Sequence, residues 1–151
     1  MRAEQKITEL GLILPQPTKP MANYIPAVRT GNLLFVSGHG PRIDGKTKGG
    51  KVGRDLTVEE GYQMARNVGL SCLATVKATL GDLDKVKRVV KLLGMVNCTE
   101  DFKDMPKVID GCSDLLVDIF WDAGRHARSA VGMQALPNQI AVEIEMILEI
   151  D

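Results

Sequence analysis

Apolar and polar residues alternate most regularly near the end of the chain. From residue 140 to residue 150 every second residue is apolar, and three of the residues between them are glutamates, Glu143, Glu145 and Glu149. Successive side chains of a β-strand point to opposite faces of a sheet. The pattern therefore predicts a strand with one buried face and one polar face.

Other stretches rich in apolar and β-branched residues predict further strands. Residues 24–29 and 33–37 flank the turn sequence Thr30-Gly31-Asn32, which predicts a β-hairpin. Residues 86–96 predict a longer strand. Residues 129–135 predict another strand, which turns at Pro137-Asn138 into the last one and forms a second hairpin with it.

Two segments carry apolar residues at three- and four-residue spacings, which is typical of amphipathic helices. The first begins at Thr57, which forms a capping-box sequence with Glu60, and ends at Gly81. The second begins within residues 101–106 and ends at Gly124. The apolar stripes consist of Met64, Ala65, Val68, Cys72, Leu73, Val76 and Leu80 in the first, and Ile109, Cys112, Leu115, Leu116, Ile119 and Phe120 in the second.

These elements indicate an α+β fold in which two helices cover one face of a four- or five-stranded sheet. We expect a single domain over residues 1–151, with residues 1–14 as an N-terminal helical extension. The glycine- and lysine-rich residues 42–55 predict a loop, a candidate lid. The uncovered face of the sheet would be half apolar, and self-association would bury it.

The charge balance and the residue composition disfavour several classes of function. Lysine plus arginine total 19 and aspartate plus glutamate total 19, so the net charge disfavours nucleic-acid binding. No segment approaches the roughly 18 apolar residues that span a bilayer, and the three cysteines lack paired spacing, so we expect a cytoplasmic protein with reduced thiols and no membrane partner. The two histidines, His39 and His126, lack metal-ligand spacing. We therefore expect no metal and no cofactor, and the roles of both histidines stay open.

Two segments resemble the RidA (YjgF) family, also labelled endoribonuclease L-PSP-like. They are Asn23 to Gly38 (NYIPAVRTGNLLFVSG) and Ala127 to Val131 (ARSAV), the latter followed by Leu136-Pro137 and by Val142 to Glu145 (VEIE). Residues 50–61 resemble the longer branch of that family. The resemblance implies a chorismate-mutase-like (bacillus type) fold that forms a homotrimer with a central barrel and one ligand cleft at each subunit interface.

The resemblance implies two catalytic residues. Arg128 matches an arginine that binds the substrate carboxylate, for which a planar guanidinium is suited; the alternative is a structural ion pair with a glutamate of the sheet. Glu145 matches an acidic residue that positions the attacking water; the alternative is a solvated glutamate on the polar face of a strand.

Further residues match the family's substrate-binding positions. Tyr24 would cover the ligand, Ser37 and Gly38 would contact its oxygens, and Ala130 would contribute its backbone. Packing is the alternative for Tyr24, and a turn is the alternative for Ser37 and Gly38. Ala130 departs from the family, because many deaminating members have cysteine there. The segment near Asp110 also departs, since it replaces an asparagine-containing one.

The resemblance implies hydrolysis of reactive enamines or imines, such as 2-aminoacrylate, to 2-oxo acids and ammonia. Such an enzyme is a hydrolase acting on C–N bonds, and its partner is a small carboxylate-bearing substrate. One alternative is a noncatalytic binder of small carboxylate metabolites. A second alternative, an endoribonuclease that inhibits translation, is disfavoured by the balanced charge and the few aromatic residues.

Overall fold

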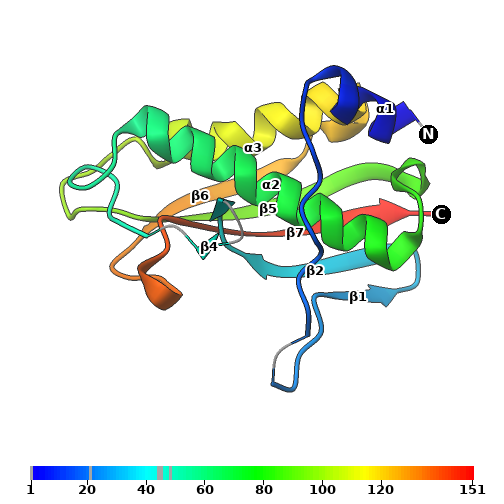
Figure 1. Cartoon of the computed structure of the whole chain (residues 1–151), viewed down its shortest axis with the longest axis horizontal. Coiled ribbons are helices and arrows are strands. Elements are labelled where there is room, and N and C mark those ends of the chain that lie inside the picture. Colours follow the sequence, from blue (N-terminus) through cyan, green and yellow to red (C-terminus); the bar gives the residue numbers. More distant parts are fainter. Residues whose placement is uncertain (1, 21, 44–45, 48) are drawn as a thin grey trace.

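Five strands form one sheet, and two long helices lie on one of its faces (Figure 1). The computed structural model describes residues 2–20, 22–43, 46–47 and 49–151. The strand order is β1-β2-β7-β5-β6. The strands are β1 (Ala27–Thr30), β2 (Leu33–His39), β5 (Val86–Asn97), β6 (Ala127–Met133) and β7 (Val142–Ile150). This arrangement confirms the predicted α+β fold.

The long helices are α2 (Val58–Leu80) and α3 (Met105–Phe120). The predicted capping box begins α2, because the Glu60 N–H donates to Thr57 Oγ1 and the Thr57 N–H donates to Glu60 Oε1, each at 3.1 Å. Gly81 ends α2 in the left-handed conformation with φ 85°. A 3₁₀ turn extends α3 to Gly124, where the sequence predicts its end. Both predicted apolar stripes are buried.

The predicted hairpin of the last two strands is wrong. β6 does not neighbour β7; it pairs in parallel with β5 at the edge of the sheet, and β7 lies between β2 and β5. The connection from β5 through α3 to β6 is therefore a βαβ crossover. One face of β7 is wholly apolar, and the central position buries it beneath the helices. Because β6 is the last strand of this sheet, its backbone pairs with a neighbouring strand on one side only.

The N-terminal helix α1 (Arg2–Glu9) falls within the predicted extension over residues 1–14 and lies against α3. Ala3 and Ile7 are buried there. The carboxylate of Asp84 accepts hydrogen bonds from the N–H groups of Arg2 and Ala3 at 2.7 and 2.9 Å. This contact anchors the first turn of α1 to the start of β5.

Within the predicted 42–55 loop, β3 (Arg42–Ile43) and β4 (Lys46–Thr47) form a small separate sheet. Residues 44, 45 and 48 lie outside the described residues, and the predicted lid falls partly on them. In the parts of the chain that the structure describes, we find no helix long and apolar enough to cross a membrane.

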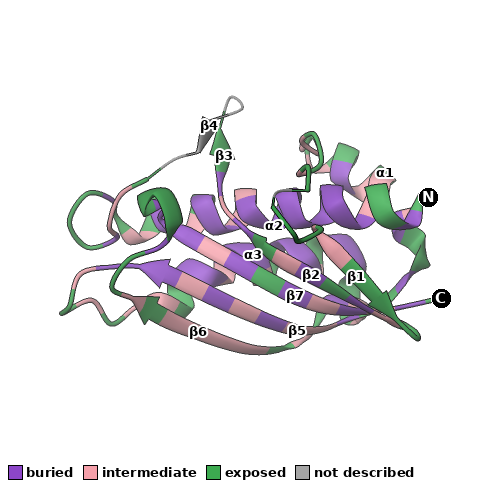
Figure 2. Ribbon diagram, turned by 90° about the horizontal axis from the view of Figure 1, so that it is seen from below, coloured by how far each residue is buried: buried purple, intermediate pink, exposed green. Residues whose placement is uncertain are grey.

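Among the residues that the structure describes, no helix covers the other face of the sheet (Figure 2). Phe35 of β2 pairs with Ile147 of β7, and both point to this open face. Val28 of β1 lies beside them, and Val28 and Phe35 are 50% and 41% exposed. The open face is therefore partly apolar in the single chain, as the sequence predicts.

Gly111 of α3 allows the two long helices to approach each other closely. A Cβ atom at this position would overlap the backbone carbonyl oxygen of Tyr62 in α2 and would lie 3.1 Å from the Arg66 nitrogen. Backbone atoms cannot move aside as a side chain can. Gly69 of α2 lies at the same interface, but its added Cβ would meet only side-chain atoms of Leu115 and Cys112 at about 3 Å.

We expect Gly111→Ala to lower the free energy of unfolding by about 1–3 kcal/mol, because the overlap outweighs the better helix propensity of alanine. Urea unfolding at constant pH measures the change. Gly69→Ala is the matched control and should cost less, because the side chains around it can shift. An unchanged midpoint for Gly111→Ala would contradict this helix contact.

Candidate functional site

Three of the predicted substrate-binding residues lie together in an open pocket of about 410 Å³ at the end of β2. Tyr24, Ser37 and Gly38 line it, and Arg42 and Glu143 complete its polar wall. Tyr24 is 47% exposed, so its ring is accessible rather than packed in the core. The predicted cleft residues of this half of the sheet are thus neighbours in space.

A β-bulge shapes this pocket. The pairing of β2 with β7 shifts register between Val36 and His39, so Ser37 and Gly38 leave the ladder. The Ser37 hydroxyl donates to the Ile25 carbonyl oxygen at 2.9 Å, and the Ser37 N–H donates to the Pro26 carbonyl oxygen at 2.8 Å. The serine oxygen keeps an acceptor position for a ligand.

Gly38 makes room for the carboxylate of Glu143. A Cβ atom at Gly38 would overlap Glu143 Oε2 and would lie 3.2 Å from its Cγ. Only glycine therefore allows this carboxylate to lie across the end of β2. Gly38 thus has both of the roles considered from the sequence. It forms part of the bulge, and it lines the pocket beside the carboxylate of Glu143.

His39 stabilises the bulge from the helix side of the sheet. Its ring is 4% exposed; Nδ1 lies 2.6 Å from the Ser37 carbonyl oxygen and Nε2 lies 2.8 Å from Thr75 Oγ1 of α2. The carbonyl contact assigns the proton to Nδ1, so Nε2 accepts from the Thr75 hydroxyl. Burial lowers the pKa of His39 and favours the neutral ring. The Ser37 hydroxyl donates to the Ile25 carbonyl oxygen and not to the His39 ring. Ser37 and His39 therefore do not form the hydroxyl–imidazole pair of a serine nucleophile and its base.

The structure places Glu143, not the predicted Glu145, on the wall of this pocket. Burial, and then the negative charge of Glu145, raise the pKa of Glu143. Glu145 is exposed two residues further along the same face of β7. The alternation in the sequence identified both glutamates, but the bulge in β2 decides which of them reaches the pocket.

Arg128 lies on the opposite side of the sheet from Glu145. Its partner in the β5–β6 register is Leu92, which is buried beneath the helices, whereas Glu145 pairs with Leu93 on the open face. Ala130 follows on the same side as Arg128, opposite Gly94. Arg128 and Ala130 are thus on the edge strand, and one chain does not bring them together with Tyr24, Ser37, Gly38 and Glu145.

Arg128 forms an ion pair, but its partner is not a glutamate of the sheet. Its Nη1 donates to Asp110 Oδ1 of α3 at 2.8 Å and to Ser113 Oγ at 3.1 Å. His126 extends the network, with Nδ1 2.6 Å from the Gly124 carbonyl oxygen and Nε2 2.9 Å from Ser113 Oγ. The geometry assigns a chain in which Arg128 donates to Ser113 and Ser113 donates to His126.

Sequence reasoning missed Asp110 and Ser113 as partners of Arg128. Their i, i+3 spacing on α3 places both on one helix face, which is a usable signal. It does not reveal which strand that face meets. A search of the described residues finds no group of three or more histidine, cysteine, aspartate or glutamate side chains that could hold a metal ion.

The fold and the pocket define an α+β protein with a helix-covered sheet, a glutamate-lined pocket at the end of β2 and an arginine on the far edge strand. Residues 4–148 match the family model described as "YjgF/chorismate_mutase-like, putative endoribonuclease". The chain belongs to this family, which confirms the resemblance found in the sequence.

Individual relatives agree with this assignment. The chain is 41% identical over 152 residues to Protein TCP17 of Trypanosoma cruzi, covering 99% of this chain and 95% of that protein. The crystal structure of the protein Atu1372, of unknown function, from Agrobacterium tumefaciens matches with a TM-score of 0.92 and 44% identity over 99% of this chain and 94% of that one. RidA from the Antarctic bacterium Psychrobacter sp. PAMC 21119 matches with a TM-score of 0.58 and 27% identity over 89% and 94%.

The environment of Glu143 yields a titration prediction. We expect its carboxyl group to titrate above the ordinary range of a glutamate, because burial and the charge of Glu145 both disfavour the ionised form. Glu145→Gln should lower the pKa of Glu143 partway, since it removes the like charge and leaves the burial. Carboxyl-carbon NMR measures both values.

Glu149→Gln is the control, because Glu149 lies on the same face of β7 but does not contribute to the shift of Glu143. It should leave the pKa of Glu143 unchanged. A wild-type Glu143 that titrates at or below the ordinary glutamate range would contradict the pocket described here.

Proposed function

We propose that three copies of the chain assemble through the open faces of their sheets, and that a ligand cleft forms where β6 of one copy meets the β2 pocket of the next. Two features of the fold support this. The open face exposes apolar side chains, among them Val28 and Phe35. The predicted site residues also divide into two groups on different sides of the sheet, so a complete cleft requires two copies.

We further propose that this cleft hydrolyses small enamines or imines that carry a carboxylate. Arg128 binds the carboxylate through guanidinium N–H groups other than those that bind Asp110 and Ser113. Glu145 holds the attacking water, and Tyr24, Ser37 and Gly38 line the cleft around the imine. The carboxyl group of Glu143 on the pocket wall is the observation that carries this proposal, because burial and the charge of Glu145 raise its pKa and so favour a carboxyl group that can give as well as take a proton.

The reaction balances with water as the only co-reactant. An enamine first takes a proton at its β-carbon and becomes an iminium. The water oxygen then forms a bond to the iminium carbon while a carboxylate takes the released proton. That proton moves to the nitrogen, the C–N bond breaks, and the hydroxyl group of the intermediate becomes the carbonyl by giving its proton to a carboxylate. This last proton replaces the one that the β-carbon took up, and ammonia and a 2-oxo acid leave. Glu143 and Glu145, two positions apart on one strand face, supply the proton acceptor and the site for the water.

The first experiment measures pyruvate released from enzymatically generated 2-aminoacrylate. We expect Arg128→Ala and Glu145→Gln each to lower turnover by roughly 10²-fold or more, as is usual for loss of a charged anchor or of acid–base catalysis. Glu149→Gln, further along the same strand face, is the matched control and should keep activity. Wild-type turnover that survives both substitutions would refute the assigned roles.

A mixing experiment tests whether the cleft lies between copies. Arg128→Ala and Glu145→Gln proteins, each inactive alone, are mixed, dissociated and reassembled. In randomly mixed trimers about one quarter of the clefts receive Arg128 from one copy and Glu145 from the next, so activity should return to that fraction. If both residues acted within one chain, the mixture would stay inactive.

A second candidate function is noncatalytic binding of small metabolites, and the Arg128–Asp110 ion pair favours it. The guanidinium is already neutralised by a carboxylate 2.8 Å away, which weakens its attraction for a second carboxylate. Calorimetry with pyruvate distinguishes the two functions. Binding without any turnover of 2-aminoacrylate would support the binding protein, whereas turnover that depends on Glu145 would support the hydrolase.

A further inference from the structure

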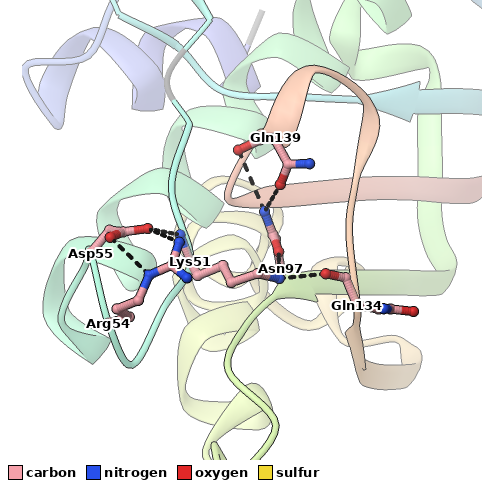
Figure 3. Close-up of polar contacts among 6 residues, drawn as sticks. All are labelled: Lys51, Arg54, Asp55, Asn97, Gln134 and Gln139. Atoms are coloured by element: carbon pink, nitrogen blue, oxygen red, sulfur yellow. Dashed lines mark hydrogen bonds and ion pairs between the residues drawn. The ribbon is translucent and has the colours of Figure 1, made fainter.

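A large cavity lies away from both groups of predicted site residues. It has a volume of about 920 Å³ and sits between Lys51, the end of β5, the start of α3 and the segment that follows β6. It shares no lining residue with the pocket at Tyr24, and Arg128 does not line it. Figure 3 shows the polar groups at this cavity.

The ammonium group of Lys51 is held at this cavity by neutral oxygens only. Its Nζ donates to Asn97 Oδ1 at 2.7 Å and to the carbonyl oxygen of Gln134. Within the described residues it forms no ion pair with a carboxylate, and these two hydrogen bonds leave one of its three N–H groups without a protein acceptor. A partly buried cation that keeps a free N–H and has no directly bound carboxylate attracts an anion.

The position of this ammonium group is fixed before any ligand arrives. Asn97 is fully buried, and its Nδ2 donates to Gln139 Oε1 at 3.3 Å, which aims its Oδ1 at Lys51 (Figure 3). The carboxylate of Asp55 accepts from the Lys51 backbone N–H at 2.9 Å. Asp55 also pairs with the guanidinium of Arg54 at 3.0 Å, so the carboxylate nearest to Lys51 is shared with a second cation and compensates the charge of Lys51 only in part.

Apolar side chains form about half of the cavity wall. Phe102, Met105 and Met133 line it, together with Cys98 and Gly132. A Cβ atom at Gly132 would lie 2.8 Å from the Cys98 sulfur and 3.5 Å from Met105 Cε, so the glycine keeps this part of the wall open. The cavity thus combines one localised positive charge with an apolar surface, as ligand pockets commonly do.

We infer that this cavity is a second binding site, which takes a small organic anion with one carboxylate and an apolar body. The carboxylate accepts the remaining N–H of Lys51, and the apolar body lies against Phe102, Met105 and Met133. A monoanion fits better than phosphate, because Arg54, which also lines the cavity, is paired with Asp55, and the ammonium group of Lys51 then supplies one further positive charge. Glu100 at the rim is exposed and further disfavours a multiply charged ligand. This site does not depend on the function proposed for Arg128 and Glu145.

The test is a ¹H–¹⁵N NMR titration of the protein with sodium benzoate, and with benzamide as the uncharged probe of the same shape. We expect saturable shifts at the amides of Cys98, Thr99 and Gln134 with benzoate, and at least tenfold weaker binding of benzamide. Lys51→Met keeps the length of the side chain and removes the charge, so it should weaken benzoate binding at least tenfold. Inorganic phosphate should bind more weakly than benzoate.

Two further variants keep the test decisive. Lys51→Arg retains the charge and should bind benzoate within a few-fold of wild type, which answers the case in which Lys51→Met fails to fold. Lys87→Met removes an exposed lysine at the opposite end of β5 and should change nothing. Equal binding of benzoate and benzamide, unaltered binding by folded Lys51→Met, or shifts confined to Tyr24, Ser37 and Gly38 would each overturn the inference.

Discussion

The central position of β7 is the constraint on which the rest of the structure depends. β7 pairs with β2 on one side and with β5 on the other, so its strict alternation imposes two faces on the whole sheet. The apolar side of β7 is buried beneath α2, and the glutamate side lies on the opposite face of the sheet. The β-bulge at Ser37 and Gly38 arises where β2 must fit against this strand, and it admits the carboxylate of Glu143. The pocket is therefore a consequence of how β7 is paired.

The same pairing separates the residues that the family resemblance groups together. β7 lies between β2 and β5 instead of forming a hairpin with β6. β6 is therefore the edge strand on the far side of β5, where Arg128 points toward α3. One chain thus presents a glutamate pocket at one place and an arginine at another. Closed cyclic symmetry is the simplest way to bring such complementary halves together, because each copy then supplies both.

Two of the partly buried cations, Arg128 and Lys51, differ in how their charges are compensated. Arg128 is neutralised by Asp110 and oriented by Ser113, whose hydroxyl is itself bound to His126. Lys51 meets only the oxygens of Asn97 and Gln134. An arginine that is directly bound to a carboxylate has less attraction for a second one, whereas an ammonium group bound only to neutral oxygens retains more of its attraction for an anion. Charge compensation, rather than the number of basic residues, distinguishes the two places.

The sequence by itself determined the elements, the two helix stripes, the two faces of β7 and the family, because periodicity and capping are local properties that tertiary contacts did not override. It also placed Tyr24, Ser37 and Gly38 in one segment, which made their shared pocket predictable. Only the tertiary structure decided that β7 inserts between β2 and β5, that Glu143 rather than Glu145 reaches the pocket, and that Asp110 pairs with Arg128. Strand order, bulge register and helix docking depend on contacts between residues far apart in the chain, and no local pattern encodes them.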